Sequence, residues 1–105
     1  MYVKAKKQKL PPPINNYDIT ITDAVYNLFE KDRDTIFKVA FLLISKIDDR
    51  EWGFVNSDTW EANNIVFENK TGIINARYLV DYNFLIVSFN INNRKMLIHL
   101  ESEIQ

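Results

Sequence analysis

The chain has 105 residues, of which 47% are hydrophobic and 26% are charged, with a formal net charge of −1 and no cysteine. This composition is typical of one ordinary soluble domain, large enough to bury a core without a metal or a disulfide. It excludes disulfide bonds, thiolate zinc sites and a cysteine nucleophile.

The first 14 residues are predicted to form a flexible basic arm, followed by a single α+β domain over residues 15–105. Pro11, Pro12 and Pro13 cannot join the interior of a sheet, because proline has no backbone N–H to donate. In a secretory signal an apolar segment follows the basic residues. Here the three prolines follow them, so the start of the chain does not have the pattern of a secretory signal. Since cysteine is also absent, the sequence favours a cytoplasmic location.

The charge is unevenly distributed along the chain. Four of the 13 basic side chains lie in the arm, so nine basic side chains remain in the domain against all 14 acidic ones. An acidic domain lacks the broad positive field that attracts a nucleic-acid backbone.

The domain is predicted to begin with a strand over Tyr17–Ile21, where polar and apolar residues alternate. Thr22 then suits the N-cap of a helix that runs from Asp23 to about Lys31, because an acidic residue is favoured at the positive end of the helix dipole. Two interpretations of Glu30–Asp34 stay open. Either an aspartate in it caps a second helix, or one long helix continues through it with its apolar residues in nearly helical phase.

The segment Thr35–Ile47 is predicted to be helical and is apolar almost all round, since only Lys38, Ser45 and Lys46 can face water. A helix that covers a sheet needs an apolar stripe on about one side. The excess is explained either by a central core helix or by an interface with another subunit. Its longest apolar run, Val39–Ile44, is far shorter than the roughly 20 residues of a membrane span, so no membrane contact is expected.

From Arg50 onward, segments rich in β-branched and aromatic residues alternate with short polar breaks. The segments predict strands over Asn64–Glu68, Ile73–Val80, Phe84–Ile91 and Lys95–Leu100. The breaks predict hairpin turns at Asn56-Ser57-Asp58, Lys70-Thr71-Gly72, Asp81-Tyr82-Asn83 and Asn92-Asn93. We therefore expect an α+β fold in which one or two N-terminal helices pack on an antiparallel meander sheet of roughly four to five strands. Because the strands hold apolar residues on both faces, the face away from the helix is expected to curl over or to contact a partner.

No motif for catalysis, metal binding or nucleotide binding stands out. The single histidine, His99, has no orienting carboxylate or nucleophile at a useful spacing, as a general base would need. Asp58 with Glu68-Asn69-Lys70 has the form of the PD-(D/E)xK nuclease motif, but such a short match is expected by chance in a chain this charged. The sequence therefore predicts no catalytic residue, no metal, no cofactor and no small-molecule substrate.

Tyr17–Ile47 contains a strand, a Thr-Asp helix start and a Lys-Asp-Arg-Asp-Thr-Ile stretch that opens a second helix. In this order of elements, under a third of the chain resembles the front of the RelE/ParE toxin fold, which continues into an antiparallel sheet. The resemblance implies an RNase toxin, and members of that family that cut mRNA on the ribosome place basic or aromatic side chains late in the sheet. The positions that could match are Arg77, Tyr78, Arg94, Lys95 and His99. Those members tend to be strongly basic, whereas this chain has a sequence pI of about 5.8.

The lack of a catalytic motif favours a small non-enzymatic protein-binding module, such as an accessory subunit or an inhibitor. Its partner would be another protein chain, identical or different. The predicted contact residues are acidic and tryptophan side chains near the end of the second helix, namely Asp48, Asp49, Glu51, Trp52, Trp60 and Glu61. Tryptophan is a favoured interface anchor, because it buries a large area with little conformational entropy to lose, although both tryptophans would equally suit the core. The frequent Asn, Ile and Lys hint at the AT-rich genome of a microbe, a phage or a mobile element.

The alternative is a nucleic-acid-binding accessory protein. It would use tyrosine and phenylalanine side chains of the sheet as stacking platforms, together with the lysines of the arm, Lys4, Lys6, Lys7 and Lys9. These lysines can supply a salt-sensitive contact, but the acidic domain would repel phosphate.

Overall fold

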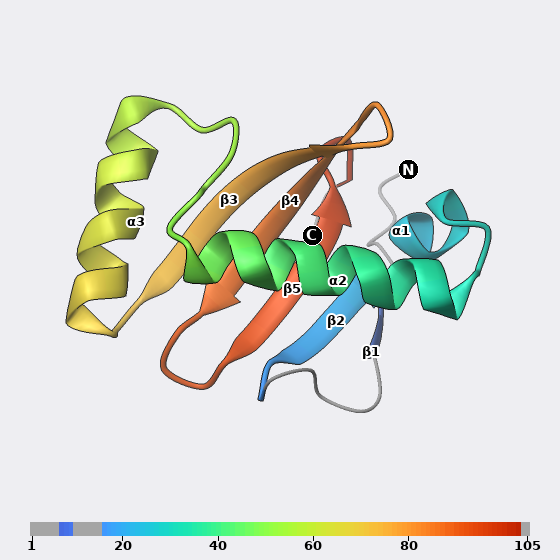
Figure 1. Ribbon diagram of the computed structural model, residues 1–105, viewed down its shortest axis with the longest axis horizontal. Coiled ribbons are helices and arrows are strands. Elements are labelled where there is room, and N and C mark those ends of the chain that lie inside the picture. The colour runs from blue at the N-terminus through green and yellow to red at the C-terminus, as the bar shows by residue number, and fades with distance from the viewer. Residues whose placement is uncertain (1–6, 10–15, 104–105) are drawn as a thin grey trace, which may run out of the picture.

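A five-stranded sheet lies at the centre of this computed structural model, which describes residues 7–9 and 16–103 (Figure 1). The strands are β1 (Lys7–Lys9), β2 (Asp18–Thr22), β3 (Ile73–Val80), β4 (Asn83–Asn90) and β5 (Lys95–Leu100). The helices are α1 (Asp23–Leu28), α2 (Arg33–Asp48) and α3 (Ser57–Asn69). Helix α2 crosses one face of the sheet, α1 lies near the start of α2, and α3 lies beside the β3 edge (Figure 1).

The sheet is mixed, with the strand order β1-β2-β5-β4-β3. Strands β3, β4 and β5 form an antiparallel meander, as predicted, and β1 pairs antiparallel with β2. Strand β2 pairs parallel with β5, with Thr20 opposite Leu97, so the prediction of a purely antiparallel sheet is wrong. A parallel pair needs a long connection. Here all three helices and two strands lie between β2 and β5 in the chain.

Part of the predicted arm belongs to the sheet. Lys7–Lys9 forms the edge strand β1, and the register sets Lys9 opposite Thr20. The prolines and the other lysines of the arm lie outside the described residues. A short edge strand that carries lysine is a poor template for pairing with a further strand.

Two helices follow β2, separated by a break in the chain. Thr22 is the N-cap of α1, and its hydroxyl accepts a hydrogen bond of 3.3 Å from the backbone N–H of Val25. After α1, Glu30 and Lys31 turn the chain with φ angles of 57° and 59°. The side chain of Asp32 then caps α2, so the interpretation with two helices is correct.

Residues 57–69 form helix α3, where the sequence predicts a hairpin turn and a strand. Asn56 starts the helix, because its side-chain oxygen accepts the backbone N–H of Thr59 at 2.8 Å and satisfies a donor that the helix itself cannot. The prediction of a strand over Asn64–Glu68 is wrong, because tertiary packing outweighs strand propensity there. The helical conformation buries Asn63 against β3.

Two of the predicted hairpin turns are confirmed. Asp81-Tyr82 joins β3 to β4 with φ angles of 48° and 66°, and a two-residue type I′ turn requires two such positive angles. Asn92-Asn93 lies in the turn from β4 to β5. The other two predicted hairpin turns are wrong: residues 56–58 form the N-cap and the start of α3, and residues 70–72 follow the end of that helix.

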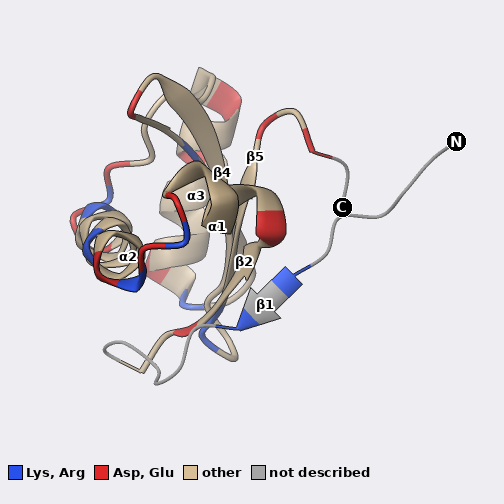
Figure 2. Cartoon of the chain, turned by 90° about the vertical axis from the view of Figure 1, so that its right-hand side faces the viewer, with Lys and Arg blue, Asp and Glu red and all other residues tan. Residues whose placement is uncertain are grey.

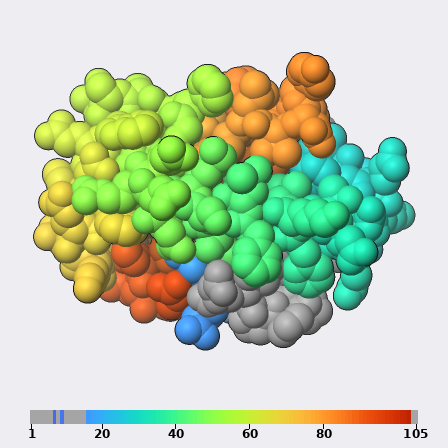
Figure 3. Space-filling model, in the orientation of Figure 1, coloured from blue at the N-terminus to red at the C-terminus, as the bar shows by residue number. Residues whose placement is uncertain are grey.

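Helix α2 supplies one layer of the core and runs across the middle of the surface seen in Figure 3. Its buried side chains are Ile36, Ala40, Leu43, Ile44 and Ile47. On its outer side, Phe41 and Leu42 are about half exposed. The apolar segment is therefore a core helix that also leaves two large apolar side chains on the surface. Among the described residues, no helix combines the length and apolarity needed to cross a membrane.

The opposite face of the sheet carries no described helix (Figure 2). In that view α2 is seen end-on at the left, and the sheet lies to its right. The register sets Leu97 beside Thr20 on one side and beside Ser88 on the other, and directly opposed side chains point to the same face. We call the face of the sheet that lies opposite the helices the open face.

Candidate functional site

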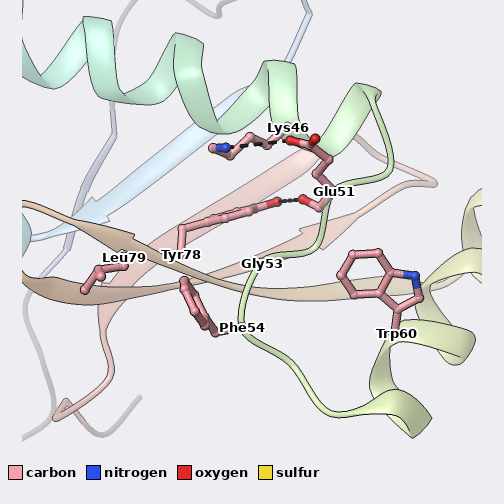
Figure 4. A pocket seen from close by; sticks show the side chains of 7 residues that line it. All are labelled: Lys46, Glu51, Gly53, Phe54, Trp60, Tyr78 and Leu79. Carbon is pink, nitrogen blue, oxygen red and sulfur yellow. Dashed lines mark hydrogen bonds and ion pairs between the residues drawn. The ribbon is translucent and has the colours of Figure 1, made fainter.

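A groove of about 300 Å³ lies where the end of α2, the start of α3 and the β3 edge meet (Figure 4). Its lining residues come from these elements and from the loop between the two helices, and they are Lys46, Glu51, Gly53, Phe54, Trp60, Tyr78 and Leu79. We call it the β3 groove.

Backbone hydrogen bonds hold the loop after α2 against β3. The N–H of Arg77 donates to the carbonyl of Trp52 at 3.1 Å, and the N–H of Phe54 donates to the carbonyl of Arg77 at 2.7 Å. Between them, Gly53 has a φ of 78°, and a Cβ there would lie 2.1 Å from the carbonyl oxygen of Arg77. Only glycine fits so close an approach, and this fit fixes the place of Phe54 at the groove.

The side chain of Asn63 covers a second stretch of the β3 edge. Its Nδ2 donates to the carbonyl oxygen of Asn75 at 2.7 Å, and its Oδ1 accepts the N–H of Asn75 at 3.0 Å. Asn63 is buried, so the same bonds satisfy a side chain that is costly to bury without partners. Sequence reasoning does not find Asn63, because a lone asparagine carries no signal for such a contact.

Three exposed apolar side chains surround the β3 groove. Phe54 is 59% exposed, Leu79 is 48% exposed and Trp60 is 40% exposed. The ring of Phe54 also packs edge-on against Phe84, with 5.7 Å between the ring centroids, and this contact holds its orientation. Large apolar side chains that are left exposed together on a small domain mark an interaction surface.

The polar groups of the β3 groove are paired with one another. Lys46 and Glu51 form an ion pair of 3.7 Å, and the hydroxyl of Tyr78 donates to the backbone carbonyl of Glu51 at 2.7 Å (Figure 4). Burial raises the pKa of Tyr78, so its hydroxyl stays protonated at neutral pH. Groups paired in this way can orient a bound chain, but they supply no free nucleophile or general base.

Two of the six predicted contact residues, Glu51 and Trp60, line the β3 groove. Trp52 is fully buried, its ring packs at 5.9 Å from that of Phe67, and its indole N–H donates to the side chain of Asn64 at 3.0 Å. It belongs to the core, which is the other role that the sequence allows for it. A partner therefore cannot use Trp52 as an anchor.

The other three predicted contact residues lie outside the β3 groove. Asp49 and Glu61 are exposed. Asp48 accepts a hydrogen bond of 2.6 Å from the hydroxyl of Tyr17, and burial together with this bond raises the pKa of Tyr17 to about 12. Asp48 and Tyr17 line a separate hollow with Arg94. The structure therefore divides the predicted acidic surface among separate places.

The structure describes two of the four lysines that are predicted for nucleic-acid binding. Lys7 and Lys9 belong to β1, and Lys4 and Lys6 lie outside the described residues. Lys9 forms an ion pair of 3.2 Å with Asp18.

The strands offer few aromatic rings to a nucleic acid. Tyr78 and Phe89 are buried on the helix side of the sheet. Phe84 lies opposite Leu79 in the register, but the guanidinium group of Arg77 covers it at 3.6 Å from the ring centroid. The described strands therefore lack the row of exposed rings on which bases stack.

Two of the residues that the RelE/ParE resemblance indicates, Arg77 and His99, are held in contacts within the domain. Arg77 donates two hydrogen bonds to the carboxylate of Glu101, at 2.9 and 3.0 Å. Nδ1 of His99 lies 2.8 Å from the carbonyl oxygen of Leu100. This contact does not give His99 the carboxylate partner that a general base uses for orientation.

The residues of the short nuclease-like motif are not brought together. Asp58 and Glu68 lie near opposite ends of α3, about 15 Å apart along the helix axis. Glu68 instead pairs with Arg50 at 2.9 Å. Over residues 7–9 and 16–103, no cluster of three potential metal ligands is present.

In comparisons with known proteins, the chain matches no family model, no curated protein and no solved structure. Function is therefore inferred from the contacts described above.

Proposed function

We propose that this protein is a small non-enzymatic protein-binding module, such as an accessory subunit or an inhibitor, whose partner chain docks in the β3 groove. The observation that carries the proposal is the convergence of three exposed apolar side chains, Phe54, Trp60 and Leu79, on one groove. Aromatic anchors in such hollows dominate the binding free energy of many protein interfaces. The ion pair of Lys46 with Glu51 lies beside them, where charges favour orientation and specificity.

The partner is expected to insert side chains into the β3 groove and not to add a strand to the sheet. The outer edge of β3 is already paired at Asn75 by the side chain of Asn63, and at Arg77 by the loop after α2. An edge covered in this way leaves little backbone for strand addition. Apolar side-chain contact is the mode of binding that the groove favours.

Site-specific photocrosslinking tests the proposal. A photoreactive phenylalanine analogue replaces Phe54 in the groove, and in a matched control it replaces Phe41, which is 51% exposed on the outer side of α2. In the cells that naturally contain the protein, we expect one discrete protein adduct from position 54 and none from position 41. Equal adducts from both positions, or none from position 54, would contradict the proposal.

Light scattering of the purified protein then identifies the kind of partner. A dimer that dissociates when Trp60 is replaced by alanine would identify a second copy of this chain. A monomer would identify a different protein as the partner, because apolar surface of this kind is favourable to bury only against a complementary chain.

A further inference from the structure

A second hollow, of about 290 Å³, lies on the open face of the sheet, away from the β3 groove. Its polar lining residues are Lys7, Thr20, Ser88, Asn90 and Lys95, and its apolar lining residues are Ile73, Met96 and Leu97. We call it the open-face hollow. It shares no lining residue with the β3 groove.

The strand register explains how these side chains meet. Leu97 lies between Thr20 and Ser88, so two hydroxyl groups flank an apolar floor. The hydroxyl of Ser88 already donates to Oδ1 of Asn75 at 3.5 Å, so the hydroxyl of Thr20 is the one that remains as a donor. Lys95 lies opposite Asn90 in the neighbouring strand. The Oδ1 atom of Asn90 accepts the N–H of Asn92 at 3.0 Å, which leaves its NH₂ group as a donor. Donors from four strands therefore surround one small volume.

The open-face hollow has a local excess of positive charge although the domain is acidic. Lys7 and Lys95 line it, and no carboxylate does. Asp18, the acidic residue opposite Lys95 in the register, forms an ion pair of 3.2 Å with Lys9. Among the described residues, neither Lys7 nor Lys95 takes part in an ion pair. Two ammonium groups are thus available to one ligand.

We infer that the open-face hollow binds the phosphate group of a small phosphate monoester. A phosphate monoester carries close to two negative charges at neutral pH and three strong acceptor oxygens, which match two ammonium groups together with the hydroxyl of Thr20 and the amide of Asn90. Leu97 contacts the organic part of the ligand. The volume is at the small end of ligand pockets in proteins, so a compact ligand fits best.

Charge on the rest of the domain disfavours a long polyanion as the main ligand. Glu101, which is paired with Arg77, and Glu103 follow β5 at the end of the sheet away from Lys95. A nucleic-acid strand that crossed the open face would bring its phosphates toward these carboxylates, whereas a single phosphate group would not.

Titration with inorganic phosphate, followed by amide chemical shifts at constant ionic strength, tests the inference. We expect saturable shifts centred on Thr20, Ser88 and Leu97. Lys95→Gln should weaken phosphate binding about tenfold, because it removes a charged donor. Lys38→Gln, an exposed lysine of α2, is the matched control and should bind as the unaltered protein does. Scattered shifts, or equal affinity in the two variants, would overturn the inference.

A comparison of two phosphate sources tests the size of the ligand. Adenosine monophosphate should bind at least as tightly as inorganic phosphate and shift the same amides. An oligothymidylate without a terminal phosphate should bind more weakly than the mononucleotide. Tighter binding of the oligothymidylate, with a steep salt dependence, would contradict the assignment to a small monoester and favour a nucleic-acid partner.

Discussion

The side chain of Asn63 and the backbone of Asn75 form a closed pair of hydrogen bonds, so that an asparagine of α3 takes the place of a neighbouring strand. A helix can therefore lie beside a sheet edge without leaving the backbone groups of Asn75 unsatisfied. The pair also fixes α3 against β3. Because Trp60 precedes Asn63 by about one helical turn, the same bonds set the place of one wall of the β3 groove.

Asn63→Ala should lower the free energy of unfolding by about 2–4 kcal/mol, because two hydrogen bonds are lost and the polar groups of Asn75 lose their partners. Denaturant unfolding measures the change. Asn69→Ala, at the exposed end of α3, is the control and should change stability by about 0.5 kcal/mol or less. Equal effects in the two variants would show that the hydrogen bonds between Asn63 and Asn75 do not contribute to stability.

Gly53→Ala should destabilise the protein by roughly 2–4 kcal/mol, because the added Cβ would collide with the carbonyl oxygen of Arg77 and φ is positive there. The loop would have to move away from β3 and would lose its two backbone bonds to Arg77. Thermal unfolding gives the stability, and hydrogen exchange at the amide of Arg77 reports the lost pairing. An unchanged midpoint with unchanged exchange would contradict this account of the loop.

Local signals in the sequence predict several elements correctly. Thr22 and Asp32 are polar residues directly before apolar helical repeats, and both cap helices in the structure. The polar break at Asp81-Tyr82 between two strand-like runs is likewise a hairpin turn. In each case a few neighbouring residues determine the conformation, so the local sequence is sufficient to predict it.

Features that depend on distant contacts could not be predicted. The run Ile65-Val66 favours a strand, yet it lies in a helix because α3 packs on β3. The sequence does not show which strand lies beside β2, so it does not predict the parallel pairing of β2 with β5. At the candidate site, Trp60 is predicted but Phe54 and Leu79 are not, because exposure of an apolar residue is a property of the folded surface.

The burial of Tyr17 and its hydrogen bond to Asp48 should make stability fall at high pH. The pKa of Tyr17 is raised from 10 to about 12, so its contribution is complete below pH 10 and is lost as the pH rises through 12. Tyr17→Phe should therefore lose less stability between pH 10 and 12 than the unaltered protein. Urea unfolding at pH values across this range measures both slopes. Parallel slopes would mean that the folded state does not hold this tyrosine in its neutral form.

Tyr82→Gly should stabilise the protein by about 1 kcal/mol, because a bulky residue with a positive φ pays a steric cost that glycine avoids. Tyr82 is 98% exposed, so few contacts are lost with its ring. The variant also has the Asp-Gly pair that type I′ turns prefer. Denaturant unfolding checks the gain. A loss of stability instead would show that the ring of Tyr82 contributes to the fold.

The affinity of the crosslinked partner, once isolated, for two variants of α3 is the most direct test of the β3 groove as a docking site. Trp60→Ala should weaken binding about tenfold or more without loss of stability, because it removes an aromatic anchor from the groove. Ile65→Ala removes a side chain that is 52% exposed on the same helix but outside the groove, and it should leave the affinity unchanged. Equal affinity of both variants for the partner would contradict the proposal that the β3 groove holds it.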